Sequence, residues 1–186
     1  MNLEEKVLSE EIFFKGHVIE VAKETVELPN GEQSTREIVH HHGAVGIFAV
    51  TDEDKIVLVN QWRAPIRKTS LEIPAGKING EDHDLMETAM RELNEETRYA
   101  PKKITKIYGF HSAVGFADEY LTLYHATGLV NVETELPQDA DEFLNLMELT
   151  FDEVQDKIKS GEITDVKTIL AVAYWEIQRL KGELHG

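Results

Sequence analysis

The sequence predicts an α/β protein, an α+β sandwich in which helices flank a mixed sheet and antiparallel strands form an N-terminal extension. Three observations lead to this class. Apolar and β-branched residues alternate in much of the first third, which is typical of strands. At residue 84 the apolar period becomes helical, and strand patterns then return. Two helical patterns end the chain, an order that indicates helices packed on a mixed sheet and not a doubly wound parallel sheet.

The strands of the first third are separated by residues that favour turns. We expect strands at residues 12–14, 17–28, 36–41, 43–50 and 56–62. Asn30-Gly31 is a strong signal for a hairpin turn, and residues 52–54 mark a second turn. We therefore expect two parts, an extension at residues 1–42 and a main domain at residues 43–186.

The segment 84–97 has the pattern of an amphipathic helix. Its apolar stripe comprises Leu85, Ala89 and Leu93, with Met86 and Met90 beside them. The acidic residues lie off this stripe. We expect the stripe to pack on a sheet while the carboxylates face a cleft.

The last third predicts three strands and two helices. The strands are expected at residues 104–110, 120–126 and 143–149. Thr150 and Glu153 have capping-box spacing and begin a helix that Gly161 should end. A second helix runs from residue 165 to 180, with Gly182 as its stop and Trp175 in the core. Its expected apolar face comprises Ile169, Leu170, Ala173, Ile177 and Leu180.

Composition restricts the class of partner. The chain has 186 residues and a formal net charge of −16, so we expect neither a nucleic-acid partner nor an anionic membrane surface. It has no cysteine, which excludes disulfides and thiol chemistry. Residues 1–11 are acidic and carry no apolar signal core, and no apolar run approaches a membrane span. We expect a cytoplasmic protein.

The stretch Arg91-Glu92-Leu93-Asn94-Glu95-Glu96 places three carboxylates close together on a helix. Like charges at this spacing destabilise a helix by roughly 0.2–0.5 kcal/mol per pair. A compensating cation is therefore expected, and oxygen ligands of this kind suit Mg²⁺ or Mn²⁺. The alternative is a solvated acidic face on which Arg91 pairs with Glu95.

With Gly76 upstream, this stretch resembles the box of the Nudix family, G-x5-E-x7-R-E-U-x-E-E-x-G-U, where U is apolar. Flanking segments resemble the ADP-ribose pyrophosphatase branch of that family, and the resemblance runs from about residue 36 to residue 177. These segments are Arg36-Glu37, Gln61-Trp62-Arg63, residues 71–76, residues 115–119 and Asp141-Glu142-Phe143.

The box departs from the family pattern at two places. One extra residue lies between Gly76 and residue 91, so neither Glu81 nor Asp82 falls in register with the first box Glu. Arg98 stands where the family has a glycine that ends the helix in a left-handed conformation. A residue other than glycine in that conformation destabilises the chain by roughly 1 kcal/mol. We expect the helix to end less cleanly and the loop through Pro101 to move.

The resemblance implies hydrolysis of ADP-ribose to AMP and ribose 5-phosphate with Mg²⁺ or Mn²⁺. It implies metal ligation by Glu92, Glu95, Glu96 and the carbonyl of Ala75, with Arg91 holding the carboxylates. Glu95 could act as a ligand or lie just behind the ligands. The base that activates water is expected in the acidic loop 133–142, which also holds Glu135, Asp139 and Asp141, and Glu142 matches best.

The resemblance also implies substrate contacts. Arg36 and Arg63 are expected to contact phosphate or ribose, and Glu72 an adenine amino group. Trp62 or Phe116 is expected to stack on a ring. Glu119 is expected to contact the terminal sugar or a metal-bound water. The alternatives are surface salt bridges for the arginines and core packing for the aromatic residues. Residues 40–42 are three histidines, which strand alternation would divide between two faces, so we interpret them as strand surface.

In the ADP-ribose branch the N-terminal strands pair with a second subunit, which implies a homodimer whose subunits both contribute to each pocket. Phe13 or Phe14 would reach the partner's pocket, unless they pack in the core. Two other functions stay open. One is the same chemistry on another nucleotide sugar, such as GDP-mannose or ADP-glucose. The other is a non-catalytic nucleotide-binding module, which the intact Glu92, Glu95 and Glu96 argue against.

Overall fold

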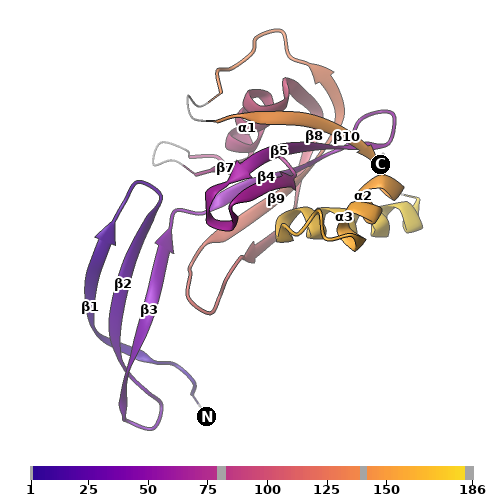
Figure 1. Cartoon of the computed structure of the whole chain (residues 1–186). Helices are drawn as coiled ribbons and strands as arrows, with labels where there is room; N and C mark the ends of the chain where they lie inside the picture. Colours follow the sequence, from indigo (N-terminus) through magenta and orange to yellow (C-terminus); the bar gives the residue numbers. More distant parts are fainter. Residues whose placement is uncertain (1, 79–82, 139–141, 183–186) are drawn as a thin grey trace. The chain divides into compact units, whose positions relative to one another are not determined.

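A computed structural model describes residues 2–78, 83–138 and 142–182. Among them, two compact units are found, one formed by residues 1–44 and 109–121 and the other by residues 45–108 and 122–186. The elements in chain order are β1 (Lys6–Lys15), β2 (Ile19–Glu27), β3 (Gln33–His41), β4 (Ala44–Ala49), β5 (Lys55–Arg63), the 3-10 turn η1 (Ala64–Ile66), β6 (Lys68–Glu72), β7 (Ala75–Lys77), α1 (Leu85–Thr97), β8 (Tyr99–His111), β9 (Tyr120–Asn131), β10 (Leu144–Thr150), α2 (Phe151–Lys159) and α3 (Val166–Lys181). Figure 1 labels all of these except η1 and β6.

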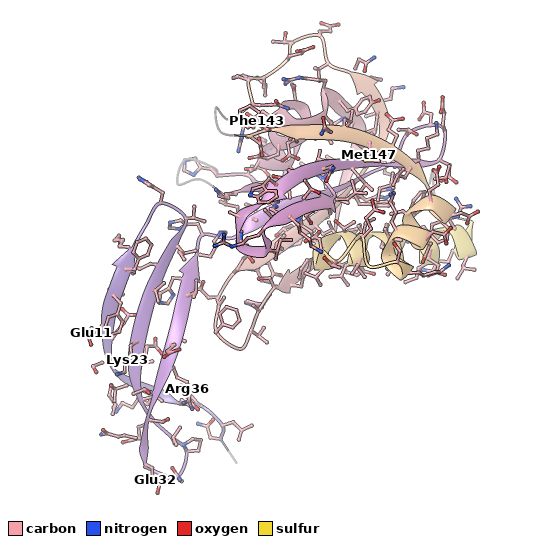
Figure 2. The ribbon with its side chains drawn as sticks, in the orientation of Figure 1. Glu11, Lys23, Glu32, Arg36, Phe143 and Met147 are labelled. Carbon is pink, nitrogen blue, oxygen red and sulfur yellow. The ribbon has the colours of Figure 1, made fainter. Side chains whose placement is uncertain are left out.

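The first unit contains an antiparallel sheet of order β1-β2-β3 (Figure 1). The predicted hairpin turn at Asn30-Gly31 is confirmed: Gly31 has a φ of 85° and its amide donates to the carbonyl of Leu28 at 2.8 Å. Opposite charges face each other across the strands, since Lys23 pairs in register with Glu11 (Figure 2). Every residue of β1 is exposed, whereas β2 buries Ala22 and Val26.

The second unit contains two sheets, of order β10-β5-β6 and β7-β4-β9-β8. One core cluster joins Val45, Ile47 and Ala49 of β4 and Val57 of β5 to α1, which contributes Ala89 and Leu93 with Leu85 beside them. The predicted stripe of α1 is therefore confirmed for these three residues. Met86 lies outside it and is exposed. The predicted α/β class with mixed sheets and helices is confirmed.

The end of α1 differs from the expectation. The helix ends cleanly at Thr97, because Arg98 adopts the left-handed conformation (φ 64°, ψ 21°) that the family's glycine would have, and its amide donates to the carbonyl of Asn94. β8 begins at the next residue, so Pro101 lies in a strand and not in a loop. β8 is an edge strand, where a proline removes no essential ladder hydrogen bond.

The structure contains two short strands that the sequence does not predict, and the buried face of one helix differs from the predicted face. β6 and β7 were not predicted. The capping box of Thr150 and Glu153 is confirmed, and α2 ends at Lys159, just before Gly161. The length of α3 and its Gly182 cap are also confirmed, but its predicted apolar face is wrong: Ile177 and the other predicted residues lie on the exposed or half-buried side. Its buried face comprises Lys167, Thr168, Ala171, Val172 and Trp175.

None of the helices in the described part of the chain is long and apolar enough to cross a membrane.

Candidate active site

The charged residues of the box, Arg91, Glu92, Glu95 and Glu96, all belong to α1. The guanidinium of Arg91 binds Glu92 Oε1 through Nη2 at 2.8 Å and Glu95 Oε2 through Nη1, also at 2.8 Å. These contacts hold two carboxylates that would otherwise repel each other. Both carboxylates are largely buried, with side-chain exposures of 13% and 19%. Arg91 therefore orients two of the three acids of the box.

Glu96 is the most buried of the three acids, with 3% of its surface exposed. It lies on the core side of α1, three residues after Leu93, so the expectation that all the carboxylates leave the apolar stripe is wrong for this residue. Its Oε2 accepts a hydrogen bond from the amide of Ala75 at 3.1 Å. Its Oε1 is buried and has no hydrogen-bond partner among the described residues. Burial first, and then the charge of Glu142, raises the pKa of Glu96 well above its ordinary value.

Glu92 has a similar environment. Burial raises its pKa to about 7, against the opposing charge of Arg91 and together with the charges of Glu95 and Glu142. The carboxyl group lies directly over Gly76, where an added Cβ would be 1.9 Å from Glu92 Cδ. The start of β7 thus meets two acids of α1. The Ala75 amide donates to Glu96, and the absence of a side chain at Gly76 leaves room for the carboxyl group of Glu92.

These carboxylates fit a hard divalent cation. Carboxylate oxygens are buried here at a cost in free energy, and one of them has no donor among the described residues. Oxygen ligands of this kind suit Mg²⁺ or Mn²⁺. Within the described residues, no three acidic or histidine side chains yet converge as a complete ligand set. Oε1 of Glu92 and Oε2 of Glu95 instead bind the guanidinium of Arg91.

Arg63 and Glu72 form a second charged group, on β5 and β6. Arg63 donates to both carboxylate oxygens, from Nε at 2.8 Å and from Nη2 at 2.7 Å. Sequence analysis missed the third member, Lys167 of α3, whose ammonium binds Glu72 Oε2 and also Asp165 Oδ1 at 3.0 Å. Burial alone would raise the pKa of Glu72, but the hydrogen bonds from Arg63 and the charge of Lys167 lower it to about 2. No pattern in the sequence links residues 72 and 167.

Trp62 and Arg63 lie on opposite faces of β5, because successive side chains of a strand alternate. The register places Arg63 on the face of Glu72, since Glu72 pairs with Val59. Trp62 is 61% exposed on the other face. The structure therefore does not bring Trp62 together with the Arg63–Glu72 pair on one face.

The remaining candidate substrate residues belong to the first unit. Arg36 is paired with Glu5 and donates to the carbonyl of Thr35 at 2.9 Å. Glu119 accepts from Ser112 Oγ. Phe116 is exposed in the turn after β8, where its carbonyl accepts from the amide of Val39 at 2.8 Å.

The histidines of β3 contact acids of the same unit. His40 Nδ1 lies 2.7 Å from Asp118 Oδ2, and this hydrogen bond raises the pKa of the His40 imidazole. His41 Nδ1 lies 3.6 Å from a carboxylate oxygen of Glu119. These two contacts go beyond the strand surface that the sequence predicts for the histidines.

Several predicted acids lie outside the described residues, namely Glu81, Asp82, Asp139 and Asp141. Glu142 is described, is half-buried, and stands just before β10. Its neighbour Phe143 is 84% exposed (Figure 2). The charge of Glu142 contributes to the raised pKa of both Glu92 and Glu96.

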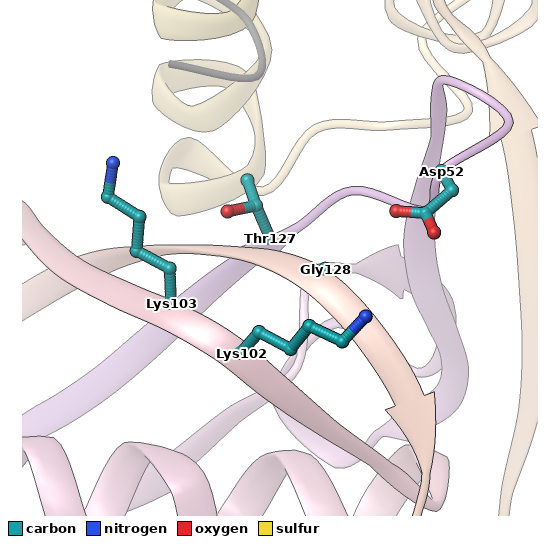
Figure 3. A pocket seen from close by; sticks show the side chains of 5 residues that line it. All are labelled: Asp52, Lys102, Lys103, Thr127 and Gly128. Carbon is teal, nitrogen blue, oxygen red and sulfur yellow. The ribbon is translucent and has the colours of Figure 1, made fainter.

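A separate pocket of about 370 Å³ lies in the second unit between β8, β9 and the turn after β4. It is lined by Asp52, Lys102, Lys103, Thr127 and Gly128. Figure 3 shows the two ammonium groups pointing in different directions. None of the predicted site residues lines this pocket, so it is separate from the acidic cluster of α1.

Comparison with known proteins gives consistent matches over most of the chain. The sequence model of the NUDIX domain matches residues 40–170. An ADP-ribose pyrophosphatase of Bacillus subtilis (strain 168) is 46% identical over 178 residues, 95% of each chain. A methanol dehydrogenase activator of Bacillus methanolicus is 47% identical over 176 residues, 94% of each chain. A crystal structure of an ADP compounds hydrolase has a TM-score of 0.84 at 19% identity and covers 98% of this chain and 99% of its own, a likeness of fold.

Proposed function

The chain belongs to the Nudix family, and from this premise we propose that it hydrolyses the pyrophosphate bond of ADP-ribose to AMP and ribose 5-phosphate. The observation that carries the proposal is the buried acidic cluster of α1, which is costly for folding unless it serves a cation. The 46% identity to an ADP-ribose pyrophosphatase over 95% of both chains supports the choice of substrate.

Glu92, Glu95 and Glu96 would hold Mg²⁺ or Mn²⁺, together with the carbonyl of Ala75. A bound divalent cation neutralises charge on a pyrophosphate and lowers the pKa of water. Oε1 of Glu96, which has no partner in the part of the chain that the structure describes, supports this assignment, because a buried anionic oxygen without a donor needs a positive partner. The role of Arg91 is to keep Glu92 and Glu95 in place through its two contacts of 2.8 Å.

Glu142 is the proposed general base. The contribution of its charge to the raised pKa of Glu92 and Glu96 supports this choice, because a base has to accept a proton from a water attacking beside the acidic cluster. Glu95, the residue before Glu96 on α1, is the alternative acceptor. Replacing Glu142 by Gln tests the choice, because it removes the base and keeps the size of the side chain.

Substrate contacts are proposed for six residues, namely Arg36, Trp62, Arg63, Glu72, Phe116 and Glu119. The exposure of Trp62 and Phe116 supports stacking on a base or sugar. Arg63 and Glu72 bind each other through two hydrogen bonds of 2.8 and 2.7 Å. To contact ADP-ribose, either residue must use polar atoms outside these two bonds or exchange its present partner for the substrate. The nucleotide and sugar specificity of the site depends on this choice.

The homodimer also belongs to this proposal. β1 exposes apolar side chains on both of its faces, including Val7 at 51%, Ile12 at 41%, Phe13 at 60% and Phe14 at 55%. An apolar edge strand of this kind favours pairing with another chain. A second copy of this chain is the proposed occupant, in the manner that the family resemblance implies.

Turnover by the purified chain with excess Mg²⁺ tests the function. The panel is ADP-ribose, ADP-glucose, GDP-mannose and NADH, with products separated by chromatography and Mn²⁺ tried in parallel. AMP and ribose 5-phosphate formed preferentially from ADP-ribose would support the proposal. Preference for another sugar nucleotide would keep the chemistry and refute the substrate. No turnover with either metal would favour the non-catalytic nucleotide-binding module.

A second candidate function comes from the relative named methanol dehydrogenase activator, which is 47% identical over 94% of both chains. On this candidate, the chain would raise the activity of a dehydrogenase. Adding the chain to a purified methanol dehydrogenase, with and without the Glu96→Gln change, tests it. Stimulation that depends on Glu96 would connect this effect to the acidic cluster.

A further inference from the structure

The C-terminal end of α1 is bound to the connection between β9 and β10. Asn94 Nδ2 donates to the carbonyl of Thr134 at 3.1 Å, and the amide of Leu136 donates to Asn94 Oδ1 at 3.1 Å. One side chain of the helix thus holds a donor and an acceptor of the same segment. The second residue involved is Arg98, which caps the C-terminal end of α1.

Arg98 adds three contacts to the same segment. Its guanidinium donates from Nη1 to the carbonyl of Leu136, and its Nε lies 3.4 Å from Glu135 Oε2. Its own carbonyl accepts from the amide of Val132 at 3.0 Å. Residues 132–136 are therefore fixed to α1 by both side chains and main chain.

Arg98 adopts a left-handed backbone conformation that favours glycine over arginine. At a φ of 64° an arginine is less favourable than glycine by roughly 1–2 kcal/mol. Glycine could end α1 equally well and at lower cost, but it could not reach Leu136 or Glu135. A side chain in this strained position therefore points to a function for the contacts it makes.

Glu142 follows the fixed segment in the sequence. Leu136 lies six residues before Glu142, and Leu144, two residues after it, pairs with Gln61 of β5. Glu142 thus stands between two attachment points, one on α1 and one on β5. We propose that Asn94 and Arg98 are positioning residues, which hold residues 132–136 against α1 and so place Glu142 beside Glu92 and Glu96. This proposal rests on the proposed role of Glu142 as the base.

Arg98→Gly separates this role from a structural one. Because glycine suits the left-handed position, the variant should keep or exceed the thermal stability of the unaltered chain. Loss of the guanidinium should nevertheless lower kcat for ADP-ribose by about 10- to 100-fold, since small displacements of catalytic groups have effects of that size, with little change in KM. Full retention of kcat would overturn the proposal.

Asn94→Ala is the second variant, and it provides a readout without turnover. Hydrogen exchange at the Leu136 amide should become faster, because that amide loses its acceptor. Thr134→Ala is the matched control, since Thr134 takes part through its carbonyl only, and it should leave kcat and exchange near those of the unaltered chain. Unchanged exchange at Leu136 in Asn94→Ala would count against the attachment itself.

A double-mutant cycle with Glu142→Gln identifies the residue through which the attachment acts. If Arg98 works through Glu142, Arg98→Gly should have little further effect on kcat in the Glu142→Gln background. The same fold-loss in both backgrounds would show that Arg98 acts elsewhere and would overturn the proposal. Absence of turnover by the unaltered chain would instead refute the proposed function, while the exchange experiment would still test the attachment.

Discussion

Gly76 and Glu92 are so close that a single methyl group cannot be placed between them: a Cβ at Gly76 would lie 1.9 Å from Glu92 Cδ and 2.2 Å from Oε1. We therefore predict that Gly76→Ala displaces the Glu92 carboxylate. Turnover with Mg²⁺ should fall at least about 100-fold, and the free energy of unfolding should fall by about 1–3 kcal/mol from overpacking. Steady-state kinetics and urea unfolding measure the two effects.

Gly46→Ala controls for overpacking without contact to the acids. Its added Cβ would lie 3.3 Å from the Cδ1 atoms of Ile73 and Leu123 in the core. It should reduce stability while retaining Mg²⁺-dependent turnover in the folded fraction. Equal activity in both variants would mean that the position of Glu92 does not matter for the chemistry.

Glu96→Gln should have opposite effects on stability and on activity. Without metal, at pH 8, removing a buried carboxylate should raise the free energy of unfolding by on the order of 1 kcal/mol, or about 2–4 °C in Tm. Turnover should fall at least about 100-fold, and the rise in Tm on adding Mg²⁺ should largely disappear.

The matched control for this variant is Glu87→Gln, an exposed glutamate in the first turn of the same helix. It should respond to Mg²⁺ as the unaltered chain does. Thermal unfolding in EDTA and in Mg²⁺ distinguishes the two variants. An unreduced Mg²⁺ response in Glu96→Gln would remove Glu96 from the ligand set.

The exposed apolar residues of β1 predict a concentration-dependent dimer. Replacing Phe13 and Phe14 together by Asp should shift the chain toward monomer, because a charge on an apolar contact surface loses its hydration on association. Size exclusion with light scattering measures the shift. Ser9→Asp, a polar position of the same strand, is the control for added charge. A monomer for the unaltered chain at all concentrations would end the dimer proposal.

The acidic helix could be predicted from sequence because its information is local. Leu85, Ala89 and Leu93 recur at helical spacing, and the left-handed position of residue 98 is readable from its place in the box. The clean end of the helix could not be predicted, because the contacts of Arg98 with Leu136 and Glu135 join residues 38 and 37 positions apart. Periodicity contains no information about such contacts.

The buried face of α3 shows the same limit. Both sides of this helix carry apolar residues, so the period alone permits two faces. The side that is buried contains Thr168, whose hydroxyl accepts from the amide of Ile73 at 2.9 Å, and Lys167, which binds Glu72. Polar contacts with β6 and the segment after it thus select the face, and hydrophobic patterning cannot predict them. For the same reason, the sequence did not predict that Lys167 binds Glu72.

Glu72 should make the stability of the chain sensitive to acid. Its pKa in the folded state is lowered from 4.5 to about 2, so its contribution is present above pH 4.5 and is lost as the pH falls toward 2. A shift of this size corresponds to on the order of 3 kcal/mol. We therefore predict that Glu72→Gln is less stable than the unaltered chain at pH 7, and that the difference narrows between pH 4.5 and pH 2. Denaturant unfolding at pH 7, 4 and 3 measures it, with Glu87→Gln as the exposed control. A difference that stays constant from pH 7 to pH 3 would show that the charge of Glu72 does not contribute to folding, and that Arg63 and Lys167 hold this side chain by its shape and hydrogen bonds alone.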